Sequence, residues 1–404
     1  MQLFAKPFVC ALEGHADGVY ALARAHDELG VLVSGSADGT LRVWDLRRRQ
    51  GVRTCGGHSG AVRGAACERG GAYALSAGDD CTARMWALPS REEMAAHEGA
   101  PAAGEELAVF RSEHGLRAVD CHWGAQRRFA TAGAGPVELW DAERSEPLSK
   151  YSWGADSTYA VRFNPSEVDV FATCGSDRAV ALYDLRSDTP IRKLVMATKS
   201  NAVAWNPREP FNFTLANEDC SAYTYDMRRL DSAMCVHRDH VSAVMDVDYS
   251  PTGREFVTAG YDRSIRIFAF NGGHSRTVYH TKRMQRVYSA RFTSDGAYVV
   301  SGSDDTNVRL WKAQADARTG VVLPKERAQS AYQNSLKQRY KHLPEVGRIM
   351  RHQHVPKAIK KAASKRREIT EADRRKQKRR EAHAAEGAYE HKPARKKRII
   401  EEQE

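Results

Sequence analysis

Histidine and aspartate residues near the start of the chain have the side chains needed for proton transfer. A carboxylate-held imidazole can take a proton from a hydroxyl, so His15, His58 and Asp38 are the first residues to consider as a catalytic set. Three signatures of catalysis are absent from the sequence, namely the G-x-x-x-x-G-K-[ST] loop, H-E-x-x-H and G-x-S-x-G. The residue types are therefore right for chemistry, but no enzyme motif accompanies them.

The same residue types recur at a regular spacing. Seven short apolar runs end in an aromatic residue, at Trp44, Trp86, Trp140, Tyr183, Tyr225, Phe268 and Trp311. In six of them an Asp lies six residues earlier, at Asp38, Asp80, Asp177, Asp219, Asp262 and Asp305. In five, Ser or Thr precedes that Asp by four residues, at Ser34, Ser76, Thr173, Thr258 and Ser301. A period of roughly 43 residues indicates a repeat protein.

The repeat indicates a structural role for these polar residues. We expect two buried hydrogen-bonded networks, one made of His15, Ser34, Asp38 and Trp44 and the other of His58, Ser76, Asp80 and Trp86. An Asp-Gly turn such as 38–39 between apolar runs is a strong hairpin signal, because glycine accepts positive φ. We therefore assign no catalytic residue, no cofactor and no small-molecule substrate.

Repeats of this length and ending resemble the WD-repeat β-propeller. The resemblance covers residues 4–311 and implies an all-β fold of seven four-stranded blades. We expect the propeller to occupy 1–311 and to be followed over 312–404 by a basic, mainly α-helical C-terminal extension.

Two irregularities of the repeat lead to local predictions. No strand-like run follows Trp311, so Phe8–Leu12 is predicted to complete the seventh blade. The third repeat has Ala134 in place of the Asp and is longer than the others, and its extra residues are rich in Ala, Glu, Gly and Pro. We predict an exposed loop between blades over 89–106.

The basic residues are concentrated in the C-terminal extension. Residues 312–404 hold 26 Lys or Arg and 12 Asp or Glu, whereas the rest of the chain holds 36 and 39. A near-neutral body with a basic tail suggests a module that is tethered to a polyanion, and RNA is the favoured candidate. A solvated tail and a nuclear import signal are the alternatives. The eight scattered cysteines contain no C-x-x-C pair, which argues against a disulfide framework and a zinc ribbon. Neither a secretory signal nor an apolar run long enough for a membrane helix is recognised.

The extension itself reads as helices separated by prolines. Pro324 precedes Ala328, Tyr332, Leu336 and Tyr340, whose spacing of four predicts a helix with an apolar stripe for the propeller or a partner. Pro356 precedes a very basic helix predicted from Lys357 to about Glu386. Its cations occupy every face, which disfavours a membrane-surface helix and suits phosphate contacts or nuclear import.

The candidate RNA contacts are the cations and imidazoles of this region. We assign them to Arg348, Arg351, His352, His354, Lys357, Lys360, Lys361, Lys365, Arg366, Arg367, Arg374, Arg375, Lys376, Lys378, Arg379 and Arg380. His352 and His354 have a metal-like spacing, but no third ligand stands nearby, so we assign no metal.

Several segments together resemble the suppressor-of-fibrillarin family of nucleolar WD-repeat proteins. They are 201–207, 216–219, 239–253, 279–285 and, above all, Arg-His-Gln-His-Val-Pro-Lys at 351–357 in a basic tail. The resemblance implies a non-enzymatic scaffold of the small-subunit processome, in the nucleus and nucleolus, with pre-ribosomal RNA, snoRNP and other processome proteins as partners. The family carries an N-terminal segment ahead of the propeller, whereas this chain starts almost at its first strand.

A second function is also ascribed to some family members. They act as substrate receptors of a cullin-RING ubiquitin ligase of the cullin-4 type, through an aromatic-Asp-x-Arg box that would bind the ligase adaptor. Matching boxes place the additional arginine at Arg47, Arg186 and Arg228. The aromatic residue and the Asp belong to the repeat in any case, so only the arginines bear on this alternative.

Overall fold

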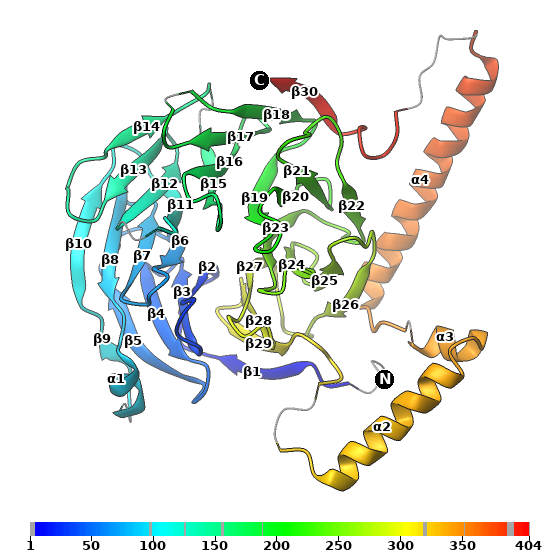
Figure 1. Cartoon of the computed structure of the whole chain (residues 1–404), viewed down its shortest axis with the longest axis horizontal. Coiled ribbons are helices and arrows are strands. Elements are labelled where there is room, and N and C mark those ends of the chain that lie inside the picture. The colour runs from blue at the N-terminus through cyan, green and yellow to red at the C-terminus, as the bar shows by residue number, and fades with distance from the viewer. Residues whose placement is uncertain are drawn as a thin grey trace.

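Seven sheets surround a central axis in the computed structural model, which describes residues 5–403 apart from 97–98, 125–126, 155–156, 188, 318–320, 351 and 386–391. Each sheet is a blade, with its first strand at the axis and its last at the rim (Figure 1). The predicted seven-bladed β-propeller is therefore confirmed.

Blades 1 to 4 form the first half of the ring. Blade 1 contains β2 (Val19–Arg24), β3 (Val31–Ser36), β4 (Thr40–Asp45), β5 (Gln50–Gly56) and β9 (Ala102–Ala103). Blade 2 contains β6 (Val62–Cys67), β7 (Tyr73–Gly78), β8 (Thr82–Ala87) and β10 (Glu106–Arg111). Blade 3 contains β11 (Leu116–Cys121), β12 (Arg128–Gly133), β13 (Val137–Asp141) and β14 (Ser149–Tyr151). Blade 4 contains β15 (Thr158–Phe163), β16 (Val170–Gly175), β17 (Ala179–Asp184), β18 (Arg192–Met196) and β30 (Ile399–Gln403).

Blades 5 to 7 complete it. Blade 5 contains β19 (Ser200–Trp205), β20 (Asn212–Asn217), β21 (Ser221–Asp226) and β22 (Cys235–Arg238). Blade 6 contains β23 (Val244–Tyr249), β24 (Glu255–Gly260), β25 (Ile265–Ala269) and β26 (Ser275–Tyr279). Blade 7 contains β27 (Val287–Phe292), β28 (Tyr298–Ser303), β29 (Val308–Lys312) and β1 (Phe8–Leu12).

The N-terminal strand closes the ring as expected. β1 pairs antiparallel with β29, with Leu12 opposite Val308 and Phe8 opposite Trp311. The last blade is thus built from both ends of the propeller sequence. This pairing covers the outer edge of β29, which would otherwise be open to other chains, and ties the N-terminal segment to the last blade.

The turn between the second and third strands is held by the repeat Asp. The residue after this Asp has positive φ in six blades, and only the first has glycine there, with Gly39 at 77°. The carboxylate of Asp38 accepts the backbone N–H of Thr40 at 2.8 Å, and Asp262 accepts that of Ser264 at 3.1 Å. These bonds offset the cost of the left-handed conformation at non-glycine residues.

The segment 89–106 is exposed over most of its length, but it is more ordered than the loop that we expected. Helix α1 (Arg91–Ala96) begins with a reciprocal cap between Ser90 and Glu93, whose backbone N–H groups each bond the other's side chain at 3.3 Å. β9 then pairs in parallel with β5. The Ser-x-x-Glu cap was a readable signal, whereas the pairing with β5 is non-local.

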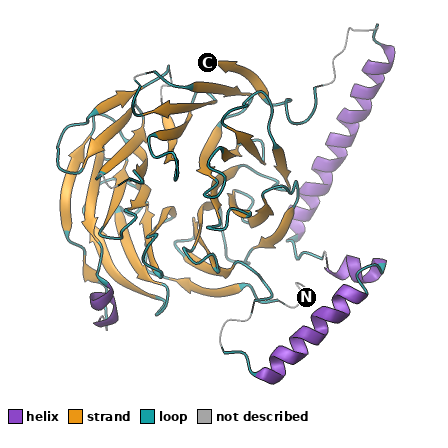
Figure 2. Cartoon of the chain, viewed as in Figure 1, coloured by secondary structure: helices purple, strands orange, loops and turns teal. Residues whose placement is uncertain are grey.

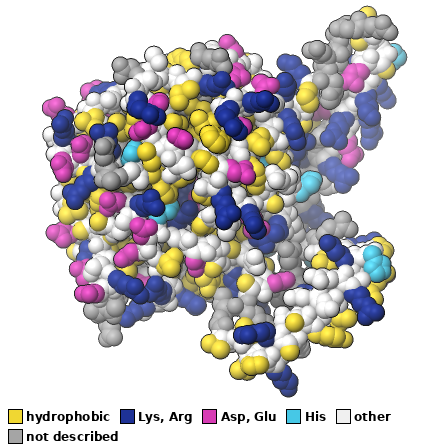
Figure 3. Space-filling model, viewed as in Figure 1, with side chains coloured by type: hydrophobic (Ala, Val, Ile, Leu, Met, Phe, Trp, Pro, Cys, Tyr) yellow, Lys and Arg dark blue, Asp and Glu magenta, His cyan; other side chains and the backbone are white. Residues whose placement is uncertain are grey.

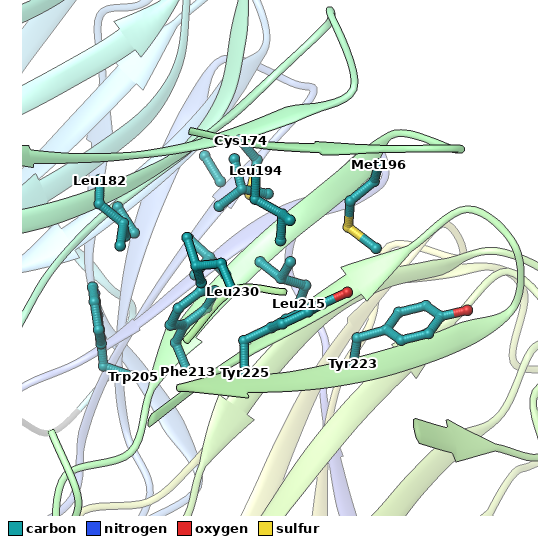
Figure 4. Close-up of a cluster of buried hydrophobic side chains, with 14 of the residues drawn as sticks. Cys174, Leu182, Leu194, Met196, Trp205, Phe213, Leu215, Tyr223, Tyr225 and Leu230 are labelled. Carbon is teal, nitrogen blue, oxygen red and sulfur yellow. The ribbon is translucent and has the colours of Figure 1, made fainter. Parts of the chain in front are cut away.

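Hydrophobic side chains fill the space between neighbouring blades. Between blades 4 and 5, Leu182 and Leu194 face Phe213, Leu215 and other apolar residues (Figure 4). Each such layer is buried on both sides, so a blade does not have a complete core of its own.

In the part of the extension that the structure describes, the chain forms three helices and a strand (Figure 2). The helices are α2 (Pro324–Arg339), α3 (Pro344–Met350) and α4 (Lys357–His383). The expectation that no strand follows Trp311 is wrong, because β30 pairs antiparallel with the outer edge of β18. Its only apolar pair, Ile399 and Ile400, is a weak local signal, so its order depends on an edge supplied by a distant blade.

Candidate functional site

The residues that resemble a catalytic set form a closed hydrogen-bonded network. His15 Nε2 lies 2.7 Å from Ser34 Oγ, which accepts the indole N–H of Trp44 at 2.7 Å, and His15 Nδ1 lies 3.3 Å from Asp38. One assignment satisfies every atom: the indole and imidazole Nδ1 donate, and the serine hydroxyl donates to Nε2. In blade 2, His58 Nε2 lies 2.7 Å from Ser76 Oγ, Trp86 Nε1 donates to that oxygen at 2.9 Å, and His58 Nδ1 lies 3.0 Å from Asp80.

Burial and charge support a structural role for these networks. Ser34 and Ser76 are fully buried, so neither hydroxyl can reach a substrate. Burial lowers the pKa values of His15 and His58, which favours the neutral imidazoles that the networks need. Burial would raise the pKa values of Asp38 and Asp80, but hydrogen bonds to their carboxylates outweigh it and hold both below the ordinary value.

Blade 5 lacks the upstream His, and the extension supplies a cation in its place. Arg398 Nε lies 3.1 Å from Asp219 Oδ2, and this Asp is only 6% exposed at its side chain. The same carboxylate oxygen accepts the hydroxyl of Tyr223 at 2.6 Å. Arg398 thus does for Asp219 what His15 does for Asp38, although it lies 179 positions later in the sequence.

The antiparallel blades give the propeller two different faces. The connections between blades and the turns after second strands lie on one face, which we call the connection face. The turns after first and third strands lie on the other, the opposite face. The extension meets the connection face and the rim, whereas the three aromatic-Asp-x-Arg boxes end third strands and lie on the opposite face.

The extension is attached to blade 6 by the segment before α4. The side-chain amide of Gln353 donates to the backbone carbonyls of Ser275 and Arg276, both at 3.0 Å. His280 Nε2 lies 3.0 Å from the backbone oxygen of His354. Part of the 351–357 motif therefore binds the propeller edge. Of its predicted contact residues, His352, His354 and Lys357 are exposed, and Arg351 lies outside the described residues.

Arg366 anchors the first half of α4. Its guanidinium donates to the backbone carbonyls of His240 at 2.7 Å and Asp219 at 2.6 Å, on the connection face. Ile359, about two turns earlier on the same face of the helix, is 8% exposed. Arg366 was predicted as an RNA contact, but its two terminal nitrogens are engaged within the chain.

The other predicted cations of the extension are exposed. They are Arg348, Lys357, Lys360, Lys361, Lys365, Arg367, Arg374, Arg375, Lys376, Lys378, Arg379 and Arg380. Figure 3 shows Lys and Arg side chains along α4, whose second half extends beyond the propeller (Figure 1). Glu371 lies 3.0 Å from Arg367 and 4.0 Å from Arg375, and no other ion pair involves these cations in the described residues.

The three box arginines have different surroundings. Asp226 binds Arg228 through both oxygens, at 3.0 and 2.8 Å, and Arg228 also stacks 4.5 Å from the ring centroid of Phe211. Arg186 Nε lies 3.2 Å from Asp184. The guanidinium of Arg47 has no hydrogen bond or ion pair to the described residues, and it lines a cavity of about 250 Å³ together with Leu29 and Leu310.

Three of the contacts that hold the extension were missed from the sequence. Gln353 and Arg398 act through partners in blades 6 and 5, and such partners have no local pattern; the burial of Ile359 in an otherwise exposed helix has none either. Conversely, the predicted apolar stripe of α2 is uncovered, since no residue of this helix is buried and Tyr332 is 66% exposed.

Neither a metal site nor a membrane-crossing helix is found among the described residues. Over the described ranges, no group of three or more His, Cys, Asp or Glu side chains is arranged to hold a metal. In the same ranges, the length and hydrophobicity that a membrane-crossing helix requires are not found together in any helix. All eight cysteines are free thiols.

Two sequence families match the chain. The Sof1-like domain matches residues 313–399, which cover the extension. The WD domain, G-beta repeat, matches 6–45, 49–87, 233–268 and 273–312, which correspond to blades 1, 2, 6 and 7.

Similar proteins cover almost the whole length of the chain. "DDB1- and CUL4-associated factor 13" of Xenopus laevis is 43% identical over 402 residues, which span 99% of this chain and 88% of that protein. The human protein of the same name is 42% identical over the same shares. "Protein SOF1" of Saccharomyces cerevisiae is 43% identical over 377 residues, 89% of this chain and 77% of that protein.

Proposed function

This chain belongs to the Sof1-like family of WD-repeat proteins, and from that membership we propose that it is a non-catalytic scaffold of ribosome biogenesis. We propose that it works in the small-subunit processome, in the nucleus and nucleolus, and supports maturation of small-subunit ribosomal RNA. The propeller would bind other processome proteins, and the extension would bind pre-ribosomal RNA or the snoRNP.

The observation that carries this proposal is the difference between the two halves of α4. Its first half is bound to the propeller through Arg366 and contains the buried Ile359, so the start of the helix has a fixed position. Its second half carries exposed cations from Arg374 to Arg380 away from the propeller. A fixed helix with an exposed polycationic end can reach a phosphate backbone without displacing its contacts to the propeller.

The test compares two variants with equal charge loss. Arg374, Arg375, Arg379 and Arg380 are changed to Gln in one, and Lys325, Arg327, Lys337 and Lys341 of the α2 region in the other. With about six phosphate contacts, the log–log salt slope for a single-stranded precursor fragment is about −4, and four lost contacts reduce it to about −1. The α2 variant should keep the slope. Equal losses in both variants would contradict a specific role for α4.

Crosslinking in cells extends this test to the natural RNA. We expect small-subunit precursor RNA or its guide snoRNA to be enriched, with crosslinked residues in 348–380. Substitution is a better tool than deletion of 321–404, because deletion also removes β30 and the Arg398 partner of Asp219. If no RNA is enriched and a ligase adaptor is recovered instead, the result would contradict RNA binding and favour the second candidate function described next.

That second function is substrate reception for a cullin-RING ligase. One structural observation favours it: the guanidinium of Arg47 has no partner among the described residues and lies beside the 250 Å³ cavity on the opposite face. Arg186 and Arg228 each hold the Asp of their own box, so they are less available. We expect Arg47→Glu to abolish co-purification of the adaptor and Arg228→Glu to weaken it less. Retention of the adaptor by the Arg47 variant would eliminate this box as the contact.

A further inference from the structure

The mouth of the central channel on the connection face has a composition that no repeat rule requires. The second residue of each innermost strand lines a depression of about 120 Å³ there. Five of these seven equivalent positions hold tyrosine or arginine, namely Tyr20, Arg63, Arg117, Tyr159 and Tyr288. Asn201 and Met245 occupy the other two. The adjoining loops add Lys199, Tyr261 and Arg286.

Each cation at this mouth is stacked on a tyrosine. Arg63 lies 4.4 Å from the ring centroid of Tyr20, Arg117 lies 5.1 Å from that of Tyr159, and Arg286 lies 4.7 Å from that of Tyr261. Stacking holds a guanidinium plane in place while its N–H groups at the edge stay free. Such arginines are preorganised to bind carboxylates in a bidentate manner.

Two of these arginines are not neutralised. Arg63 is paired with Asp79 at 2.9 Å, and Lys199 lies 3.6 Å from Glu218. Arg117 and Arg286 are exposed and form no ion pair in the described residues. The mouth therefore presents two cations that lack a carboxylate partner in the described residues, and one of them, Arg286, also interacts with the Tyr288 side chain.

We propose that the channel mouth of the connection face binds a peptide segment of a partner protein through acidic side chains placed at Arg117 and Arg286. The depression has room for one side chain between the tyrosines, with Asn201 and Met245 at its wall. A peptide can carry carboxylates at the two positions that meet Arg117 and Arg286 and neutral residues elsewhere, so it need not bring negative charge to the acidic side chains of the mouth.

A single-stranded RNA fits this mouth less well. Its backbone carries a charge at every nucleotide, so phosphates would also meet Asp79, Glu218 and Asp304. One face of Tyr20 carries Arg63, and Tyr288 lies 4.6 Å from its ring centroid, which leaves little aromatic surface for stacked bases. Because positive and negative side chains alternate around the mouth, a peptide fits it better than a polyanion does.

The test uses the full chain and a phage-displayed library of random twelve-residue peptides. We expect enrichment of peptides with two or more Asp or Glu residues. Arg117→Glu with Arg286→Glu should weaken binding of the best enriched peptide at least about tenfold, because two charge-assisted contacts are lost. The matched control is Arg254→Glu, an exposed arginine in a first-turn loop on the opposite face. It should leave the affinity unchanged, and equal thermal midpoints would verify folding.

Three outcomes overturn the proposal. These are enrichment without acidic residues, an equal loss of peptide affinity in the Arg254 variant, and a double variant that binds peptide normally but loses affinity for a twelve-nucleotide oligouridylate. The last outcome would assign the mouth to RNA. Because the peptide assay does not involve the second half of α4, the α4 glutamine variant should bind the peptide normally. Failure of the RNA proposal is thus distinguishable from failure of this one.

Discussion

Single polar residues inside the blades are tied to their partners by burial. Ser34 accepts the indole proton of Trp44 and reaches His15, and its exposed fraction is zero. A hydroxyl in this position bonds two partners that water cannot reach. Its removal costs more than the hydroxyl's own hydrogen bonds, because both partners stay buried and unsatisfied.

We expect Ser34→Ala to lower the free energy of unfolding by about 2–3 kcal/mol, since it leaves the Trp44 indole and the His15 imidazole without partners. Urea denaturation followed by tryptophan fluorescence measures this change. Ser59→Ala, at an exposed serine in a blade connection, is the control and should stay within about 0.5 kcal/mol. A similar, small change in both variants would refute the network as a source of stability.

The burial of His237 makes the free energy of unfolding depend on pH. Its Nε2 lies 2.9 Å from Thr224 Oγ1, its Nδ1 lies 2.6 Å from the backbone oxygen of Gly272, and burial lowers its pKa from 6.5 to about 4. The unfolded chain therefore takes up the proton first, so stability is complete above pH 6.5 and falls as the pH drops towards 4. The loss at pH 5 is about 2 kcal/mol.

Urea denaturation at pH 7.5 and pH 5 tests this dependence. His237→Asn should reduce the difference between the two pH values, whereas His342→Asn, at an exposed position, should retain it. An unchanged difference in the His237 variant would show that other groups cause the acid sensitivity.

Elements are joined here by a few charged contacts. α4 is bound at its first half by Arg366, and the chain returns to the propeller through Arg398 and β30. A helix with exposed residues over most of its length gains little from burial, so these contacts decide where it lies.

Arg366→Gln should release the first half of α4, because it removes two charge-assisted hydrogen bonds to backbone carbonyls. We expect amide hydrogen exchange in 357–367 to accelerate about tenfold or more. Lys365→Gln removes the same charge from the neighbouring exposed position and should leave exchange unchanged. Equal exchange in the two variants would mean that Ile359 and Gln353 suffice.

The whole molecule depends on closure of its ring. β1 supplies the outer strand of blade 7 and buries Leu12 against that blade. Without it, β29 becomes a free edge, and a free edge favours association with other chains.

Removal of residues 1–12 should lower the free energy of unfolding by at least about 3 kcal/mol, through lost ladder hydrogen bonds and Leu12 burial. It should also produce oligomers, which light scattering after size-exclusion chromatography detects. Removal of 399–404 is the comparison, because it opens an edge of blade 4 and leaves the ring closed. A monomeric, stable β1-deleted chain would contradict this account of closure.

The sequence by itself determined the blades, their number and their closure. The spacing of Asp and aromatic residues is local, and so are the turn and the network of each blade; even the blades outside the four matched WD repeats were readable in this way. The resemblance of the tail was likewise carried by a short contiguous motif, and the Sof1-like match over 313–399 confirms it.

Only the tertiary structure decided which cations are free. Arg366 and Arg374 belong to the same basic pattern, yet one is bound to His240 and Asp219 and the other is exposed. Arg47 and Arg228 share one motif and differ in the same way. The physical reason is that availability depends on partners brought together by ring closure and strand addition, over sequence separations that no local pattern encodes.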